Sequence, residues 1–559
     1  MEIRTPQLPL KETLLYWANQ IKERRWTYLL GIAAVAGTNL VDVSIPKLLG
    51  MNIDALEKEH IFYPKLIVAL VLIYILQFAC RFTWRRTLAL QSFQCSANFK
   101  STLWNRARFF PLSVFHKKFT RGELINLGTG DIANAQNAFG FHFVATTDFL
   151  FLFSLATIAM FMINVKLTLI SLVLFPIIPI LVYFICEKES KLYEESQNSL
   201  SKLNDTVDSI VGSAKLMKLR PHAPLWNNQL KKAALHYQDQ RATLLKTEAQ
   251  YFPASALPPA LSVIFFLVFG IQAYKEGSLT TGQLVAFHSY LFMIADPLSE
   301  LGWIVSDWQK SLTSVQRLLA VFAEPQDPIF KAKKLPEKTL LPLEITNLKF
   351  SYDSKNTILS IPELHLRPRE RLGICGKVGS GKSTLGKIVA GLEANYTGSV
   401  KVLGTEVRDF QNTELRKKVL LVDQNPFLFG SSVRENLSLN HEFSDEEIWH
   451  WLEVVDLVDD FKKIPDGLKA HLGEWGINLS GGQRQRLTLA RTLCRKPELL
   501  ILDDALSAVD VMTEAKIIKN LELNLKDLSV LLISHRPSSL QLCHRQCYIE
   551  NHFLGEAHV

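Results

Sequence analysis

Residues 371–392 read RLGICGKVGSGKSTLGKIVAGL, and this stretch decides how the second half of the chain folds. The apolar run at Arg371–Cys375 predicts a buried strand, and Thr384–Leu392 has the composition of a helix. Between them lies the pattern G-x-x-x-x-G-K-[ST]. Its glycines let backbone N–H groups curl around phosphate oxygens at the N-terminus of the helix. The strand, loop and helix therefore predict a phosphate-binding loop in an α/β domain.

The loop predicts the cofactors, which are ATP and Mg²⁺. We expect Lys382 to neutralise the β- and γ-phosphates and Ser383 to ligate the magnesium ion. A second metal ligand is predicted at Asp503, which ends the apolar run LLILD at 499–503. The nucleotide is expected to contact Gly376, Lys377, Val378, Gly379, Ser380, Gly381, Lys382, Ser383 and Thr384.

Short apolar strands and helical stretches alternate on both sides of the loop. Val419–Val422, Leu499–Leu502 and Val530–Ile533 are predicted strands, because each is a short apolar run rich in branched residues. We assign residues 341–559 to an α/β nucleotide-binding domain. Residues 324–340 contain three prolines and a basic run, which is typical of a linker.

The first part of the chain is richer in apolar residues. It raises the hydrophobic fraction of the whole chain to 48% and its mean hydropathy to +0.10. A membrane span needs about 20 mostly apolar residues, and six stretches before about residue 305 qualify. We assign residues 1–323 to an α-helical polytopic membrane domain, whose connections at 82–140 and 187–250 form long intracellular helices interrupted near their middles. The predicted spans are about Trp26–Leu49, Pro64–Cys80, Phe141–Ile163, Leu167–Cys186, Tyr251–Tyr274 and Gly282–Val305.

The basic residues that give the net charge of +8 are distributed as the predicted membrane topology requires. Lysines and arginines gather before the first span and in the two long connections, whereas the opposite loops hold little beyond Lys58, Lys166 and Lys275. Basic residues accumulate in cytoplasmic loops, so both termini are predicted to be cytoplasmic and no nucleic-acid partner is needed to explain the charge. The seven cysteines have no spacing typical of a metal site.

The segment LSGGQRQR at 479–486 resembles the signature of ATP-binding cassette proteins. With six spans ahead of the cassette, the chain resembles a half-transporter of the exporter type. This resemblance implies ATP-driven export across the cytoplasmic (inner) membrane and a partner half-transporter. It also implies that the signature residues Ser480, Gly481, Gly482 and Gln483 contact the ATP held by the partner's loop.

Further roles follow from the same resemblance. Tyr352 is similar to the aromatic residue that stacks on adenine, and Gln424 to the glutamine that contacts Mg²⁺ and senses the membrane domain. His535 resembles the switch histidine near the γ-phosphate. The segment Ser507–Asp510 resembles the loop that crosses between paired cassettes, and is called the crossing loop below.

Other segments resemble the parts that join membrane domain and cassette. Gly122–Asp131 and Ser213–Leu219 look like the regions of the coupling helices. Gly473-Glu474-Trp475-Gly476 stands where exporters carry a Gly-Glu-Arg-Gly-like motif, so Trp475 departs from the family pattern.

Asp504 departs from the pattern in a way that bears on catalysis. The family has glutamate after the Walker-B aspartate, and that glutamate positions or deprotonates the attacking water. An aspartate is one methylene shorter, and a misplacement of about 1 Å can cost on the order of 100-fold in rate. We predict slow hydrolysis at this chain's own loop and favour a heterodimer with a competent partner. A homodimer with two slow sites, or adequate hydrolysis by Asp504 with His535, are the alternatives.

The cargo is constrained only loosely by polar residues within the spans. Asn39, Asp42, Asp148, Asp296 and Glu300 are the candidates, since intramembrane acids usually face a bundle interior or water. Acidic lining would favour cationic or amphipathic cargo among small molecules, lipids and peptides. A different functional class, a nucleotide-gated regulatory or channel-like subunit, is the alternative to an exporter.

Overall fold

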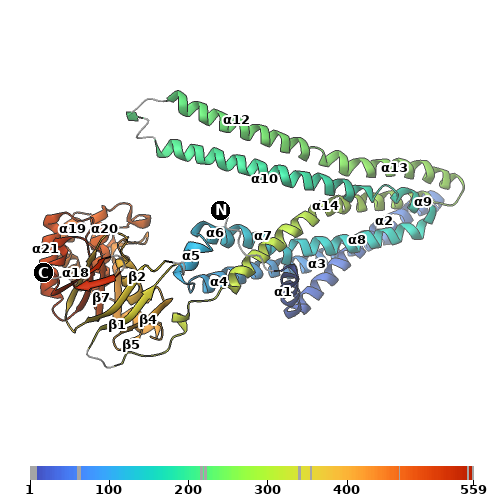
Figure 1. Ribbon diagram of the computed structural model, residues 1–559. Helices are drawn as coiled ribbons and strands as arrows, with labels where there is room; N and C mark the ends of the chain where they lie inside the picture. The colour runs from blue at the N-terminus through green and yellow to red at the C-terminus, as the bar shows by residue number, and fades with distance from the viewer. Residues whose placement is uncertain are drawn as a thin grey trace. The chain divides into compact units, whose positions relative to one another are not determined.

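The computed structural model describes residues 9–59, 64–213, 218–219, 223–337, 341–352, 356–464, 466–550 and 553–556 (Figure 1). The chain divides into two compact units, and each is described by itself. The membrane unit comprises residues 1–105 and 121–323, and the cassette unit comprises residues 106–120 and 324–559. The division at Ala323 and Glu324 falls where the linker was predicted to begin, but residues 106–120 lie with the cassette.

The described residues of the membrane unit form helices joined by short turns. Its longest helix, α14, runs for 43 residues from Thr281 to Ala323. The elements of this unit are α1 (Leu10–Glu23), α2 (Arg25–Glu59), α3 (Pro64–Trp84), the π-turn Arg85–Ala89, α4 (Leu90–Ala107), α6 (Arg121–Asn126), the π-turn Leu127–Asp131, α7 (Ile132–Phe139), α8 (Phe141–Ile163), α9 (Val165–Leu172), α10 (Ile177–Gly212), α12 (Ala223–Glu248), α13 (Tyr251–Lys275) and α14.

Five helical stretches among the described residues are long and apolar enough to cross a membrane. They overlap each of the first five predicted spans, although the second stretch begins at Ile67 and not at Pro64, and they extend well beyond them, as the 48-residue stretch Val165–Gly212 does. The sixth predicted span falls in α14, which is not among these five. Gln283, His288 and Asp296 lower its hydropathy, so this sixth span stays a prediction.

The spans pack as neighbours in sequence and across the bundle. Helix α2 packs against α3, α8 and α14, and α10 runs alongside α12 as a long hairpin (Figure 1). Asn164 caps α9 by accepting a hydrogen bond from the Leu167 N–H at 2.9 Å. Because Ile163 ends α8 and Val165 starts α9, the predicted tight hairpin between the third and fourth spans is confirmed.

The two long connections are interrupted, but the first one earlier than expected. Helix α4 ends at Ala107, and the short helix α5 (Leu112–Lys117) belongs to the cassette unit. In that unit the Phe109 carbonyl accepts a hydrogen bond from the Asp327 N–H at 2.8 Å, and the rings of Phe109 and Phe330 lie 4.9 Å apart. The coupling role expected of Gly122–Asp131 stays a prediction. The second connection breaks after Gly212, and residues 214–217 of the other expected coupling region lie outside the described residues.

The cassette unit is built on a ten-stranded sheet in the order β5-β4-β1-β2-β10-β9-β3-β8-β7-β6. Strands β3, β8, β7 and β6 are parallel, and β1 pairs antiparallel with β2 and β4. The strands are β1 (Leu343–Phe350), β2 (Leu359–Leu366), β3 (Arg371–Gly376), β4 (Tyr396–Val402), β5 (Thr405–Glu406), β6 (Val419–Val422), β7 (Leu499–Asp503), β8 (Ser529–Ile533), β9 (Arg545–Glu550) and β10 (Phe553–Glu556).

Helices and short 3-10 turns complete the cassette. They are the turn Pro328–Lys331, α15 (Lys382–Val389), α16 (Asn412–Lys418), α17 (Val433–Ser438), α18 (Asp445–Val454), α19 (Val458–Lys462), the turns Gly467–Lys469 and Glu474–Gly476, α20 (Gly481–Leu493), α21 (Val511–Asn524) and α22 (Pro537–Leu540). Every residue of β7 and β8 is buried, as expected of central parallel strands covered on both faces. The carboxyl ends of these two strands therefore place Asp503, Asp504 and His535 at the same edge of the sheet.

Candidate nucleotide site

The phosphate-binding loop connects β3 to α15 and requires glycine at specific positions. Gly376, Gly379 and Gly381 have φ angles of 149°, 83° and 96°, which side-chain-bearing residues rarely adopt. A Cβ at Gly381 would lie 2.7 Å from the Ile358 carbonyl oxygen, and one at Gly376 would collide with the Ile549 carbonyl. The loop thus forms a cradle in which backbone N–H groups lie close to a bound group.

Lys382 and Ser380 place polar groups in this cradle. The Lys382 ammonium donates to the carbonyls of Gly376 and Lys377 at 2.8 Å each. Burial lowers the pKa of Lys382, while the charges of Asp504 and Asp503 oppose that shift. The Ser380 hydroxyl is buried and has no hydrogen-bond partner among the described residues. A buried cation and an unpartnered hydroxyl in a glycine cradle fit the phosphates of a nucleotide.

Ser383 and Asp503 form the predicted metal pair. The Ser383 hydroxyl donates to Asp503 Oδ1 at 3.0 Å, and Asp503 is only 2% exposed at the end of β7. Burial raises the pKa of Asp503, and the carboxylates of Asp423 and Asp504 add to that effect, whereas the hydrogen bond from Ser383 lowers it. Within the described part of the chain no three acidic, histidine or cysteine side chains form a metal cluster. Two oxygen ligands fit Mg²⁺, which takes its other ligands from phosphates and water.

Asp504 is held by the residue predicted to be the switch histidine. Its carboxylate oxygen Oδ1 lies 3.0 Å from His535 Nδ1 and accepts the His535 backbone N–H at 3.3 Å. The backbone of Asp504 has a φ of 44°, and its N–H donates to the Ile533 carbonyl at 2.9 Å. The backbone of Asp504 is thus in the left-handed region of φ, directly after β7 and beside the end of β8. Its short side chain is directed to His535.

Tyr352 lies beside the start of the loop helix. Its hydroxyl is 3.3 Å from Thr384 Oγ1, and its ring packs edge-on against Phe350 at 4.8 Å. The Tyr352 side chain is 39% exposed. Stacking on adenine stays a prediction.

Gln424 is exposed after β6. Its backbone carbonyl accepts a hydrogen bond from Gln485 at 3.4 Å. No described contact joins its side chain to Ser383 or Asp503, so its predicted role at Mg²⁺ stays a prediction. Gln424 instead lines a surface groove of about 880 Å³ together with Trp475, Arg484 and Ser507.

The signature forms the N-terminus of α20. The Ser480 hydroxyl accepts the Gln483 N–H at 3.2 Å, and the Gln483 side chain accepts the Ser480 N–H at 2.8 Å, which is a capping box. A Cβ at Gly482 would lie 2.9 Å from the Ala508 carbonyl oxygen, so the signature packs tightly on the crossing loop. The first turn of α20 and the crossing loop therefore occupy one surface.

Two residues that sequence reasoning passed over hold the crossing loop. From the signature helix, Gln485 donates to the Ser507 hydroxyl at 2.8 Å and accepts the Ala508 N–H at 2.8 Å. From the other side, Arg536 donates to the Val509 carbonyl at 3.0 Å. The sequence could have indicated both residues by their positions, because Gln485 lies in the signature segment and Arg536 directly follows His535.

Arg536 also connects the crossing loop to a buried carboxylate. It donates to Glu514 at 2.8 Å, and Glu514 is 1% exposed. Glu514 further accepts hydrogen bonds from the hydroxyls of Ser538 and Ser539 at 2.9 and 2.5 Å. The segment that carries His535 is thereby tied to α21 and to the crossing loop.

Trp475 has a backbone that suits its position in a turn but is rare for its residue type. Its φ is 60°, its side chain is 51% exposed and its ring packs edge-on against Phe427 at 5.0 Å. Phe427 in turn packs against Phe429 at 4.9 Å. The departure from arginine therefore gives the cassette an exposed aromatic cluster in place of a cation.

Three of the polar residues in the spans have partners on neighbouring helices. Asn39 of α2 donates to Asp148 of α8 at 2.9 Å. Asp42 accepts a hydrogen bond from Gln77 of α3 and forms an ion pair with Arg81 at 3.5 Å. These contacts satisfy the two acids within the bundle, which weakens the idea that they attract cationic cargo. The side chain of Asp296 lies outside the described residues.

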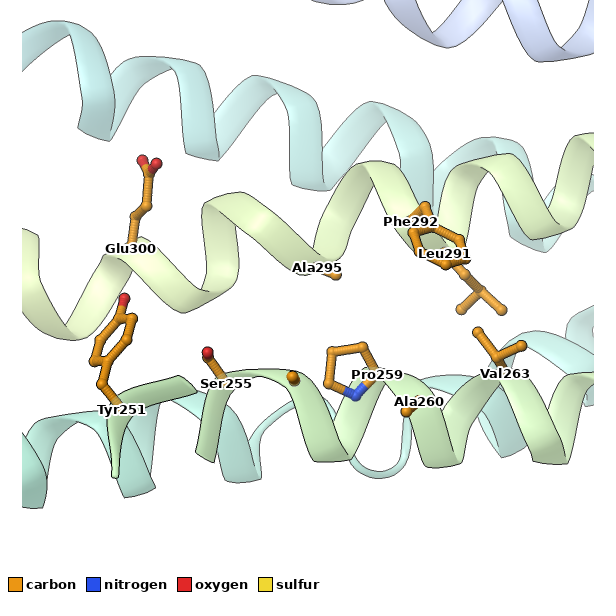
Figure 2. A pocket seen from close by; sticks show the side chains of 10 residues that line it. Tyr251, Ser255, Pro259, Ala260, Val263, Leu291, Phe292, Ala295 and Glu300 are labelled. Carbon is orange, nitrogen blue, oxygen red and sulfur yellow. The ribbon is translucent and has the colours of Figure 1, made fainter. Parts of the chain in front are cut away.

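Glu300 borders a cavity of about 480 Å³ between α13 and α14. Figure 2 shows the hydroxyls of Tyr251 and Ser255 directed from α13 toward α14. The Glu300 carboxylate extends from α14 on the side away from α13 (Figure 2). The remaining lining includes Pro259, Val263 and Leu291, so this cavity suits an apolar group with a hydrogen-bonding end.

Comparison with known proteins agrees with both halves of this description. Residues 28–298 match the ABC transporter transmembrane region, and residues 359–507 match the ABC transporter family. The chain is 29% identical to the multidrug resistance-like ATP-binding protein MdlA of Buchnera aphidicola subsp. Baizongia pistaciae, over 95% of this chain and 92% of that protein. It is 28% identical to MdlA of Escherichia coli (92% and 88%). It is 27% identical to the probable multidrug resistance ABC transporter ATP-binding/permease protein YheI of Bacillus subtilis (92% and 89%).

Proposed function

The chain belongs to the ABC transporters, with the transmembrane region and cassette of an exporter, and on this premise we propose that it exports a hydrophobic or amphipathic compound as half of a dimer. It is an ATPase whose hydrolysis is coupled to transport. Three similar bacterial proteins carry names that refer to multidrug resistance, which supports multidrug-like cargo for this chain. The proposed location is the cytoplasmic membrane, with both termini in the cytoplasm.

One observation carries the proposal, namely the joint placement of the glycine cradle, Lys382 and the Ser383–Asp503 pair. When bound there, Mg-ATP supplies a phosphoanhydride bond whose cleavage releases free energy. Lys382 neutralises phosphate charge, and Ser383 with Asp503 holds the magnesium ion. Tyr352 lies against the adenine ring, and Gln424 transmits the nucleotide state of the site to the membrane unit.

Hydrolysis at this chain's own loop is proposed to be slow. A carboxylate at Asp504 must hold the attacking water, yet its oxygen Oδ1 already contacts both His535 Nδ1 and the His535 N–H. The aspartate side chain is short, so its carboxylate cannot both reach the attacking water and keep these contacts with His535. General-base positioning tolerates little error, so this competition lowers turnover.

A heterodimer follows from the contrast between Asp504 and the signature. Ser480, Gly481, Gly482 and Gln483 form a regular capped helix start, which is suited to close over ATP held by a partner. This chain combines an impaired loop site with an intact signature. Such a chain fits a partner whose loop site is competent, because this chain's signature would complete that site. A homodimer with two slow sites is the second candidate. A nucleotide-gated regulator is a third, but it would not require the capped signature or the tied crossing loop.

Transport in inside-out vesicles tests the proposal. The full chain is produced with the partner that copurifies with it, and uptake of fluorescent amphipathic dyes is followed with ATP and with a non-hydrolysable analogue. ATP-dependent uptake that is lost in Lys382→Ala supports an exporter. Dye flux that is equal with ATP and with the analogue points to a gated channel and overturns the proposal.

A further inference from the structure

A second cavity in the membrane unit lies between α2, α8 and α14 and has a volume of about 480 Å³. Most of its wall is apolar, with Leu40 and Val43 from α2, and Leu155, Ile158 and Met162 from α8. Helices α2 and α8 belong to stretches apolar enough to cross a membrane. The cavity therefore offers an apolar enclosure within the helical bundle.

One end of this cavity is closed by a direct backbone contact. A Cβ at Gly50 would lie 2.5 Å from the Gly282 carbonyl oxygen, so only glycine permits α2 and α14 to approach this closely. Asp54 secures the contact, because it accepts hydrogen bonds from the Thr280 hydroxyl at 2.6 Å and from the Gly282 N–H at 2.7 Å. Both carboxylate oxygens of Asp54 are thus engaged at the start of α14.

Lys47 lines the cavity one helical turn before Gly50. It is the only cation among the described lining residues, and no described carboxylate forms an ion pair with it. Asp54 also lines the cavity, seven residues further along α2, or about 10 Å at 1.5 Å per residue, and both of its oxygens accept hydrogen bonds from residues 280 and 282. An intramembrane lysine is costly and needs either a route to the head-group region or an anionic partner.

We propose that this cavity binds a single-chain amphiphile with a carboxylate head group. The head group contacts the Lys47 ammonium, and the chain lies against Leu40, Val43, Leu155 and Ile158. At roughly 30 Å³ per non-hydrogen atom, the cavity holds about 16 such atoms, which matches one alkyl chain with its head group and not a two-chain lipid. Binding needs neither ATP nor hydrolysis, so this site goes beyond the export function proposed above.

Binding of three matched probes tests the site. Dodecanoate, dodecylammonium and dodecanol share a chain and differ in charge. They are titrated at alkaline pH, where the carboxylate is ionised, against the full chain in nanodiscs of zwitterionic lipid, with empty nanodiscs subtracted. The expected order is dodecanoate first, because it alone pairs with Lys47. Lys47→Ala should weaken dodecanoate binding by about tenfold, and Lys47→Arg should retain it.

Charge inversion makes the result independent of any general loss of fold. Lys47→Glu should bind dodecylammonium more tightly than dodecanoate, which a misfolded protein would not do. Lys275→Ala is the control, since Lys275 ends α13 outside the cavity lining. Equal binding of dodecanoate by the original chain and Lys47→Ala, or no preference among the probes, would overturn the site and show that Lys47 only extends to the membrane surface. Charge-selective binding without ATP-driven transport would leave the site standing and count against the export proposal alone.

Discussion

Lengthening the side chain at position 504 should restore hydrolysis at this chain's own nucleotide site. In Asp504→Glu the added methylene extends the carboxylate by up to about 1.5 Å, the length of one C–C bond. The present carboxylate lies 3.0 Å from His535 Nδ1, so the longer side chain can move past this contact toward the bound nucleotide while His535 stays in place. Since about 1 Å of misplacement costs on the order of 100-fold, we expect kcat to rise between about 10-fold and 100-fold.

The assay is steady-state phosphate release by the purified full chain, alone and with its copurified partner. The KM for ATP should change little, because Lys382 and the glycine loop are untouched and the gain lies in the transition state. Asp527→Glu is the control: its side chain is 84% exposed, and the same chemical change there should leave kcat unaltered. An unchanged or lower kcat in Asp504→Glu, with ATP binding intact, would refute the claim that side-chain length limits this site.

Three further perturbations test other parts of the cassette. Lys382→Ala should weaken binding of a fluorescent ATP analogue by at least about tenfold through loss of phosphate neutralisation; unchanged affinity would remove the lysine from the site. Arg536→Ala should leave buried Glu514 without its cation, lower stability by about 3–5 kcal/mol and lower kcat with little change in KM. Partial recovery of kcat in Arg536→Lys would distinguish positioning of the crossing loop from a purely structural role. Burial raises the pKa of Glu370, but its hydrogen bond and ion pair with Arg545 outweigh this and set the folded pKa below the ordinary value. That contribution to stability is present above the unfolded pKa and is lost as pH falls through the lower folded one, so Glu370→Gln should reduce Tm at neutral pH and have no effect at low pH; a pH-independent difference would contradict it.

The cassette was the most predictable part of the chain because its decisive contacts are local. The strand, glycine loop and helix at 371–392 are contiguous, and steric limits on φ allow few conformations of that loop. The apolar runs of β7 and β8 likewise identify central strands, since only a strand covered on both faces is apolar at every position. Placement of Lys382, Ser383 and Asp503 near one another followed from the rule that parallel strands end at one edge.

The contacts that tune the site were not predictable, since they join residues distant in sequence. The engagement of Asp504 by His535 depends on β7 and β8 being neighbours and on a left-handed backbone at Asp504. The hold of Arg536 on the crossing loop depends on the same neighbours. No periodicity or motif encodes which polar groups meet across such distances, so sequence reasoning named Asp504 and His535 but not their contact.

The membrane unit shows the same limit. Apolar runs located the helices, but they did not reveal that Asp42 would accept a hydrogen bond from Gln77 and pair with Arg81, or that Asn39 would donate to Asp148. Two of the four acids behind the expectation of cationic cargo, Asp42 and Asp148, therefore already have partners. Residues 106–120 belong to the cassette unit, in which Phe109 contacts Asp327 and Phe330, and local helix signals do not express such contacts between distant residues.

A single-turnover experiment on the purified full chain tests the central claim, that ATP is held at Gly376–Ser383 while Asp504 limits its cleavage. The chain is mixed with substoichiometric radiolabelled ATP and Mg²⁺, and bound nucleotide and released phosphate are counted over time. The account predicts rapid binding that Lys382→Ala weakens, followed by cleavage far slower than in Asp504→Glu. Brisk cleavage by the original chain that disappears in Asp504→Ala would contradict it, since Asp504 would then be a fully competent catalytic group.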